Sequence, residues 1–300
     1  METLQTSLRN TAQRLTIPDN HRLIYTTAAT AAVALLAYSR HCYVEWLALG
    51  EGGVPYSLRG WLMNVAAHLI ARRDPRAVPA PYEKAKAATT AIVLSASEEE
   101  RYGAHARTSF LPGTHALPPR RAHRPTVPAT VIPQRQTTAT ADAAAVATQN
   151  AYLAALAAAN PRLLAVKPSA LESPRFAALW LAPSAQVAVP GVDAAAATVD
   201  PARAKWLPRG AACGEIAHVH HEGSAHVCLS LADAAEVVRK GWGERHRMSG
   251  VRGILPWGYV LVYAPGQDEA EWEVWRGVVV AAARAVARSA GFEGEIVVPA

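Results

Sequence analysis

Two short runs of alternating residues, separated by a tight turn, constrain the fold of this chain more than any other feature. The runs are residues 215–220 and 225–229, and His221-Glu222-Gly223 lies between them. Three residues ending in glycine fit a hairpin loop, because glycine readily takes the left-handed position after a type I turn. The sequence therefore predicts an antiparallel β-hairpin with a defined register.

This register sorts the side chains of the hairpin onto two faces. His218 lies opposite His226, and directly opposed residues point to the same side of a sheet. One face then carries His218, His220, His226 and Cys228. The other face carries an apolar set suited to a core, namely Ala217, Val219, Val227 and Leu229. A two-residue loop would mix the two sets, so their clean separation favours the three-residue loop.

The residues after the hairpin indicate the fold class. Ser230 is a helix N-cap with Asp233 at capping-box spacing, and Gly241 is the glycine expected just beyond the helix end. Residues 258–263 predict a strand, and residues 268–289 predict a long helix. A hairpin followed by these elements is typical of an α+β domain rather than a doubly wound sheet. We expect a single compact domain in which an antiparallel sheet packs against helices.

The distribution of proline and alanine predicts the structure of the segments that precede the hairpin. Six prolines in residues 112–133 exclude a regular helix or a central strand, which predicts an extended segment over the domain. Residues 139–159 are alanine-rich and free of proline, which predicts a helix. Residues 176–181 predict a buried strand. Ser57 predicts the N-cap of an amphipathic helix whose apolar stripe we expect to pack in the core, with a position on a membrane surface as the alternative.

The N-terminal segment predicts a membrane anchor. Seventeen uncharged residues lie between Arg22 and Arg40, close to the roughly 20 that a helix needs to cross a bilayer. We expect residues 1–42 to form a single-pass N-terminal hydrophobic helix in the endoplasmic reticulum or another internal membrane, and residues 43–300 to form the folded domain. A cleaved signal peptide and a buried helix are the alternatives for this segment.

Charge, cysteine content and missing motifs exclude several functional classes. The formal net charge is +6, but the aromatic residues do not interleave with a basic patch, so no nucleic-acid partner is expected. Three widely spaced cysteines make no disulfide framework. The sequence also lacks a Gly-x-Ser-x-Gly elbow, a phosphate-binding loop and a dinucleotide fingerprint.

Three imidazoles on one face of a hairpin are compatible with four roles. They could bind a metal ion, since histidine is a good ligand for zinc, iron or copper. They could transfer protons in an organic active site, or hold an anionic ligand. They could also be hydrogen-bonded polar residues at the surface of a sheet. The residue pattern leaves these roles open.

Several motifs resemble the luciferase-like domain of the fungal luciferases. In the C-terminal third they are Glu215-Ile-Ala-His-Val-His220, residues 227–231, Val238-Arg-Lys-Gly-Trp-Gly-Glu-Arg-His246 and residues 262–265. Upstream they are Arg59-Gly60, Arg124-Pro125 and Ile132-Pro-Gln-Arg-Gln136. The resemblance is strongest over residues 214–266 and assigns residues 43–300 to a luciferase-like domain.

The resemblance implies an oxygenase that oxidises a phenolic pyrone such as 3-hydroxyhispidin with molecular oxygen. It implies no flavin, ATP or nicotinamide, and we expect neither a cofactor nor a metal. The hairpin loop is shorter here than in luminous members, so family membership and light emission are separate questions. The expected catalytic residues are His218, His220 and His226; His218 or His220 would remove the enol proton, and His226 would help to hold the anion. The expected substrate-binding residues are Arg245, His246, Trp242, Trp257 and Tyr263.

Two other functions are compatible with the same residues. One is a metal-dependent enzyme that uses the three histidines of the hairpin as ligands. The other is a non-catalytic module that keeps the fold and binds a small aromatic ligand.

Overall fold

The computed structural model describes residues 19–79, 82, 101–103, 105–112, 117–182, 213–292 and 294–299. The chain divides into two units, Met1–Ala48 and Leu49–Ala300, which are described separately. Residues 1–18, part of the expected anchor, lie outside the described residues.

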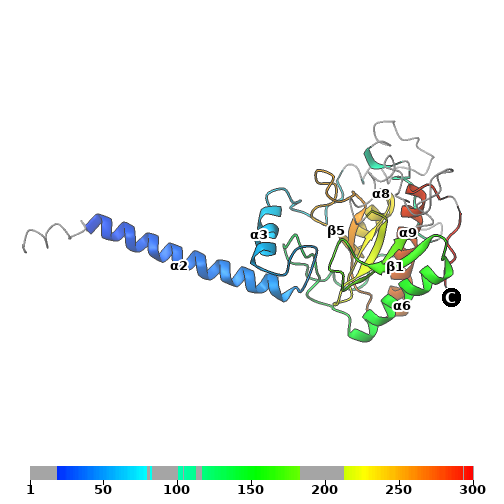
Figure 1. Cartoon of the computed structure of the whole chain (residues 1–300), viewed down its shortest axis with the longest axis horizontal. Helices are drawn as coiled ribbons and strands as arrows, with labels where there is room; N and C mark the ends of the chain where they lie inside the picture. The colour runs from blue at the N-terminus through cyan, green and yellow to red at the C-terminus, as the bar shows by residue number, and fades with distance from the viewer. Residues whose placement is uncertain are drawn as a thin grey trace, which may run out of the picture. The chain divides into compact units, whose positions relative to one another are not determined.

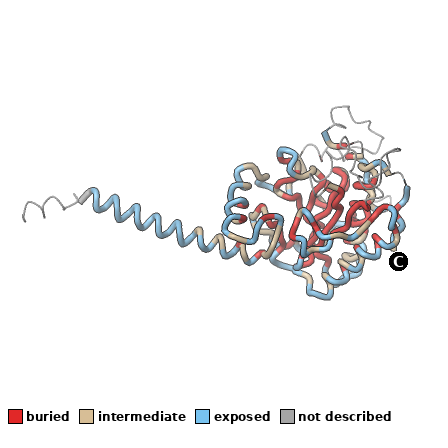
Figure 2. Tube along the Cα trace, viewed as in Figure 1, coloured by how far each residue is buried: buried red, intermediate tan, exposed pale blue. Residues whose placement is uncertain are grey.

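The N-terminal unit contains one long helix, α2 (Asp19–Ala48), whose surface is exposed over most of its length (Figures 1 and 2). Alanine and threonine make the segment only weakly apolar, and the hydroxyl groups of Thr26 and Thr30 donate hydrogen bonds to backbone carbonyls one turn earlier. Within the described residues, no helix combines the length and the apolarity that crossing a bilayer needs. The predicted single-pass anchor in an internal membrane is therefore wrong.

The second unit is built on an antiparallel sheet in the strand order β1-β2-β3-β4-β6-β5. Its strands are β1 (Leu164–Pro168), β2 (Ala177–Leu181), β3 (Glu215–Val219), β4 (Ala225–Cys228), β5 (Gly243–Arg245) and β6 (Tyr259–Val262). Strands β2, β3, β4 and β6 confirm the predicted segments. Strands β1 and β5 were not predicted; they are short strands on the two edges of the sheet.

The helices of this unit begin after serine or aspartate residues, although the Ser57 side chain before α3 makes no capping hydrogen bond. They are α3 (Leu58–Ala67), α6 (Ala143–Ala159), α8 (Leu231–Arg239) and α9 (Glu269–Ser289). The Ser230 hydroxyl accepts the backbone N–H of Asp233 at the start of α8, and Gly241 has φ +84° just after its end. Asp142 and Asp268 cap α6 and α9 in the same way. The predicted α+β class is confirmed.

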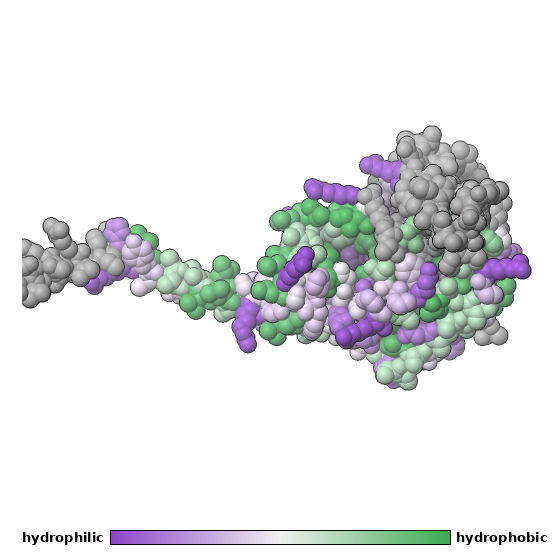
Figure 3. All heavy atoms as spheres, viewed as in Figure 1, coloured by the Kyte–Doolittle hydropathy of each residue, from purple (hydrophilic) through white to green (hydrophobic). Residues whose placement is uncertain are grey.

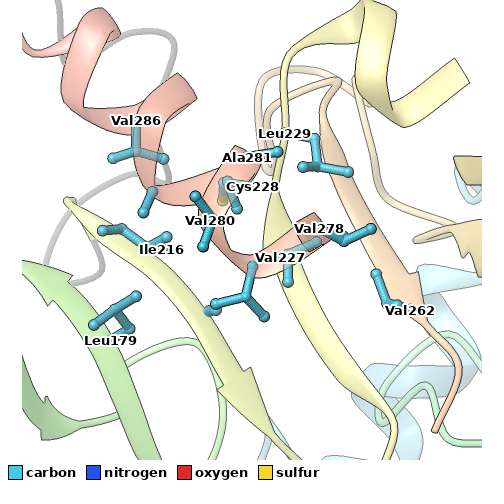
Figure 4. Packing of buried hydrophobic residues seen from close by; sticks show 14 of the residues in the cluster. Leu179, Ile216, Val227, Cys228, Leu229, Val262, Val278, Val280, Ala281 and Val286 are labelled. Atoms are coloured by element: carbon cyan, nitrogen blue, oxygen red, sulfur yellow. The ribbon is translucent and has the colours of Figure 1, made fainter. Parts of the chain in front are cut away.

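One face of the sheet packs against helices to form the apolar core. Helix α9 lies on β3 and β4, α6 lies on β1, β2 and β3, and α8 lies on β5 and β6. Figure 4 shows Val227 and Val262 of the sheet beside Val278 and Val280 of α9, and all four are nearly inaccessible. Burial of this apolar surface is the main force that joins sheet and helices.

The apolar stripe of α3 does not enter this core, contrary to the prediction. The buried residues of α3 are Gly60 and Asn64. Leu58, Leu62, Met63 and Val65 are exposed, and apolar surface gathers over this helix in Figure 3. Asn64 is buried because its side-chain carbonyl accepts the backbone N–H groups of Val131 and Ile132, so a polar contact orients the helix.

Irregular segments cover the opposite face of the sheet. Residues 117–142 contain neither helix nor strand, which agrees with the extended segment predicted from its prolines. The side chains of Gln134, Arg135 and Gln136 in this segment are buried. This segment brings polar groups onto the face of the sheet that carries the histidines.

Candidate functional site

The hairpin has the predicted register. His218 pairs with His226 and Ala217 pairs with Val227. The backbone N–H of His220 donates to the carbonyl of Ser224 at 2.8 Å. Gly223 closes the loop with φ +90°, the left-handed conformation that glycine adopts without strain.

The three predicted catalytic histidines form a buried cluster. Their ring centroids lie 5.1 Å apart for His218 and His220, 5.3 Å for His218 and His226, and 4.6 Å for His220 and His226. The ring of His246 lies 5.2 Å from that of His226, and Tyr259 covers His226 at 4.8 Å. All four imidazoles are at most 5% exposed, so the cluster is shielded from bulk water.

In each hairpin histidine, one ring nitrogen contacts a polar side chain that orients the ring. Nδ1 of His218 lies 2.7 Å from Oε1 of Glu215. Nδ1 of His220 lies 2.8 Å from the hydroxyl of Ser224. Nε2 of His226 lies 3.3 Å from Oε1 of Gln134. The second nitrogens of His218 and His226 lie 3.3 Å apart, and within the described residues Nε2 of His220 has no hydrogen-bond partner.

Glu215 is a buried carboxylate with a full set of donors. Burial raises its pKa, but hydrogen bonds from His218, the Ser169 hydroxyl and the Ala170 backbone together outweigh burial, so the pKa is lowered. The backbone N–H groups of Ala170 and Leu171 donate to Oε2 at 2.8 and 3.1 Å. Glu215 is therefore ionised at neutral pH and fixes the orientation of the His218 ring.

Glu172 and Arg135 complete the cluster. Oε2 of Glu172 lies 3.9 Å from Nε2 of His218, while Oε1 accepts a hydrogen bond from Arg135. Nε of Arg135 lies 3.7 Å from Oε2 of Glu222. Arg135 is only 1% exposed, and such a buried guanidinium is stable only because carboxylates and carbonyls surround it.

The surroundings keep the imidazoles of His220, His226 and His246 uncharged. Burial, followed by the positive charge of Arg135, lowers the pKa of His220 well below its ordinary value. Burial and the neighbouring His220 and His246 do the same for His226. Burial, followed by Arg247, lowers the pKa of His246 to about 3. Near pH 7 these three histidines are neutral, and each has one nitrogen with a lone pair.

The structure brings only some of the predicted substrate-binding residues to the cluster. His246 contacts it directly. Tyr263 is linked to it indirectly, because its hydroxyl donates to Glu244 at 3.0 Å and Glu244 accepts from Gln134 at 3.1 Å. Burial, followed by Glu244, raises the pKa of Tyr263, so its hydroxyl keeps its proton at neutral pH.

The other predicted substrate-binding residues lie elsewhere. The guanidinium of Arg245 is directed away from the cluster, because it packs over Tyr82 at 5.3 Å and donates to the carbonyl of Asp74 at 3.0 Å. Trp242 is a core residue whose Nε1 donates to the carbonyl of Pro118 at 2.6 Å. Arg135 occupies the place next to the histidines that was predicted for Arg245.

Trp257 borders a separate cavity of about 380 Å³. The cavity lies where β4 ends and β6 begins, and its lining includes Tyr102, His105 and Ser230. None of the four clustered histidines is among the described residues that line it. Trp257 therefore lines a pocket that does not reach the imidazoles, and its contact with substrate stays a prediction.

Sequence comparison identifies the segment that carries the histidines. The luciferase domain family matches residues 214–282. Residues 214–282 of this chain are therefore similar to a luciferase domain. The luciferases of Armillaria gallica and Armillaria mellea are 44% identical to it over 59 residues, and that of Neonothopanus nambi is 42% identical over the same length. No solved structure matches the chain.

The luciferase domain match confirms the resemblance found from the sequence, but it covers only a short segment of the chain. Each alignment covers 18% of this chain and 22% of the length of the curated relatives. All four clustered histidines and Glu215 lie within the matched residues. Glu172, Arg135 and Gln134 lie outside them, so the match does not cover these three groups beside the cluster.

Proposed function

We propose that this protein is a luciferase-like oxygenase that oxidises an electron-rich phenolic pyrone with molecular oxygen, 3-hydroxyhispidin being the first compound to test. The observation that carries the proposal is the buried cluster of His218, His220, His226 and His246 within the segment that is similar to a luciferase domain. The names of the relatives support a luciferase-like reaction. The choice of substrate rests on the resemblance to their family.

Such a reaction makes three demands on the protein. A group must accept the enol proton, so that an electron-rich anion can give electrons to oxygen; the pyrone is the reductant and oxygen the oxidant. Positive or hydrogen-bonding groups must stabilise that anion. The surroundings must keep water from the oxidised intermediate. No organic cofactor is needed for these steps.

The cluster offers a group for each demand. Because Nδ1 of His218 lies against the carboxylate of Glu215, this nitrogen carries the proton and Nε2 is the basic nitrogen. His220 presents Nε2 in the same way, since Nδ1 is bound to Ser224. Arg135 supplies a buried guanidinium, whose charge is shared with Glu172 and Glu222. The basic nitrogens can accept a proton or bind a metal ion.

The test is oxygen consumption by the purified chain with 3-hydroxyhispidin, read together with light emission and product mass. We expect oxygen uptake that depends on the pyrone and a product whose mass shows oxygen incorporation. Replacing air with argon should stop the reaction, since oxygen is a substrate. Absence of oxygen uptake with 3-hydroxyhispidin and with a panel of other enolic pyrones would contradict the proposal.

The role of the cluster in that reaction is tested with His218→Gln. Loss of a general base typically lowers turnover by about 10²–10⁴-fold. Far-UV circular dichroism should show a folded protein, because glutamine has a similar size and remains polar. Turnover equal to that of the unsubstituted protein would remove the cluster as the site of reaction.

A further inference from the structure

We infer that Glu172, His218, His220 and His226 form a binding site for one divalent first-row transition metal ion. Each of these residues offers a ligand atom, the four atoms lie within 4.8 Å of one another, and all four residues are buried. A metal–ligand distance of about 2.0–2.2 Å puts neighbouring ligand atoms roughly 3–3.5 Å apart. The four side chains therefore need only a small contraction to surround an ion.

The hydrogen bonds on the outer side of the cluster fix which nitrogens face inward. Glu215 is a carboxylate and can only accept, so His218 carries its proton on Nδ1 and a lone pair on Nε2. Oε1 of Gln134 also only accepts, so His226 carries its proton on Nε2 and a lone pair on Nδ1. The Ser224 hydroxyl donates to Glu222, so it accepts from Nδ1 of His220 and leaves a lone pair on Nε2.

Three imidazole lone pairs are thus directed into one buried space. Nε2 of His218 and Nδ1 of His226 lie 3.3 Å apart, and two acceptors at that distance repel unless something positive lies between them. Within the described residues, Nε2 of His220 has no partner at all. Buried polar atoms without partners are rare and costly in folded proteins. A metal ion would satisfy all three nitrogens.

A proton is a weaker explanation for the same contacts. One proton shared by His218 and His226 would pair those two nitrogens. It would leave Nε2 of His220 without a partner, and Oε2 of Glu172 at 3.9 Å from His218 would remain too far for a hydrogen bond. A metal ion accounts for all four ligand atoms at once.

The outer partners follow the pattern of known metal sites. Histidine ligands commonly donate their second ring N–H to a carboxylate, a carbonyl or another acceptor, which fixes the ring and makes the inward nitrogen more basic. Glu215, Ser224 and Gln134 do this for the three hairpin histidines. The structure therefore contains both the ligands and the groups that orient them.

The charges of the cluster favour a cation. Three buried carboxyl groups, those of Glu172, Glu215 and Glu222, lie next to the histidines, and among the described residues the buried guanidinium of Arg135 pairs with two of them, Glu172 and Glu222. Buried negative charge without compensation is strongly unfavourable. A divalent ion between Glu172 and the histidines would supply the missing positive charge.

The ligand set selects the kind of metal. Three imidazoles and one carboxylate suit zinc, iron, cobalt or copper, whereas calcium and magnesium prefer oxygen ligands. Histidine–carboxylate sites with open coordination positions hold iron(II) in oxygenases. A redox-active ion of this class would fit the proposed use of oxygen; that role rests on the proposed function, whereas binding of the ion does not.

The test measures binding of cobalt(II), zinc(II) and iron(II) to the full-length chain, purified with a tag that contains no histidine and stripped with a chelator. We expect one ion per chain by elemental analysis, visible cobalt(II) absorption bands of a nitrogen-rich site, and a higher Tm with metal. Calcium and magnesium should not compete. Failure of all three transition metals to bind would overturn the inference.

Three variants locate the ion. His220→Gln and Glu172→Gln remove a ligand and should abolish or strongly weaken binding. Ser224→Ala keeps every ligand and removes only an orienting partner, so affinity should fall by about 10–100-fold. The control is His221→Gln, since His221 is half exposed at the hairpin loop and should not affect binding. Unchanged affinity in both ligand variants would place the metal elsewhere and overturn the inference.

The two proposals fail in different ways. Stoichiometric metal binding without oxygen uptake would support the metal site and contradict the proposed function. Oxygen uptake by a chain that binds no transition metal would support the proposed function and overturn the metal site.

Discussion

Glu215 uses both carboxylate oxygens to connect the histidine cluster to the loop that follows β1. Oε1 accepts from His218 and from the Ser169 hydroxyl at 2.6 Å. Oε2 accepts the backbone N–H groups of Ala170 and Leu171. A single side chain therefore orients a histidine and holds a buried turn in place.

The change Glu215→Gln should lower the free energy of unfolding by about 1–3 kcal/mol. Glutamine has one acceptor oxygen, so its NH₂ group would face donors and leave them unpaired in a buried place. Urea denaturation measures the change. The matched control is Glu269→Gln on the surface of α9, where Glu269 pairs with Arg276 and the loss should stay below about 1 kcal/mol. Equal losses would show that Glu215 is not structurally special.

At the scale of elements, the β3–β4 hairpin depends on the conformation of one glycine. Gly223 has φ +90°, and a Cβ atom there would lie 2.4 Å from Cβ of Ala141 and 3.1 Å from Cβ of Ala264. The carbonyl of Gly223 also accepts from Gln149 of α6 at 2.8 Å. The loop is thus enclosed by its neighbours as well as left-handed.

The change Gly223→Ala should therefore destabilise the protein by at least about 1 kcal/mol, the typical cost of a left-handed alanine, with the clash adding to it. It should also displace Ser224 and weaken the hold on His220. Thermal unfolding measures the first effect. Gly266→Ala is the control, because its nearest contact is the flexible end of Glu271 at 3.1 Å. A Tm as high as that of the control would refute the prediction.

The packing of α9 on the sheet gives a second prediction for an element. Val278 is inaccessible and lies in the core between α9 and the sheet (Figure 4). Val278→Ala should cost about 2 kcal/mol, because two buried methyl groups are lost and a cavity remains. The same change at Val297, which is 60% exposed, should cost little. Chemical denaturation of both variants compares the two, and equal costs would mean that this helix does not contribute to the core as described.

At the scale of the whole molecule, the sequence predicted the elements that depend on nearby residues. It did not predict the elements that depend on contacts between distant residues. The hairpin register followed from one turn and from alternation, and the start of α8 followed from Ser230 and Asp233. These features depend on residues a few positions apart. The short edge strands β1 and β5 carry no such signal, since pairing with β2 and β6 is what defines them.

The groups around the histidines were missed for the same reason. Glu172 lies 46 residues before His218 and Arg135 lies 83 residues before it, in segments without regular structure. Nothing local distinguishes Glu172 from a surface carboxylate. Arg135 lay in a motif that resembled the family, and that was the one available signal. Arg245 lies in the motif that ends at His246, but alternation along the chain sends its side chain to the other side.

The membrane-anchor prediction was wrong because the segment is not apolar enough. The segment between Arg22 and Arg40 has the absence of charge that an anchor needs, but its alanines and threonines contribute little apolarity. A membrane-spanning helix needs both an absence of charge and a high apolarity, and the spacing of the arginines indicated only the first.

We propose above all that the buried histidine cluster is where oxygen reacts with a small enolic molecule. Two neighbouring histidines test it most directly, because His220 is fully buried in the cluster and His221 is half exposed. The measurement is the initial rate of oxygen consumption with 3-hydroxyhispidin by His220→Gln and His221→Gln. Each variant is assayed at the same number of degrees below its own Tm. We predict a fall of at least about 10²-fold for His220→Gln and an unchanged rate for His221→Gln. Equal rates in the two variants would contradict the account.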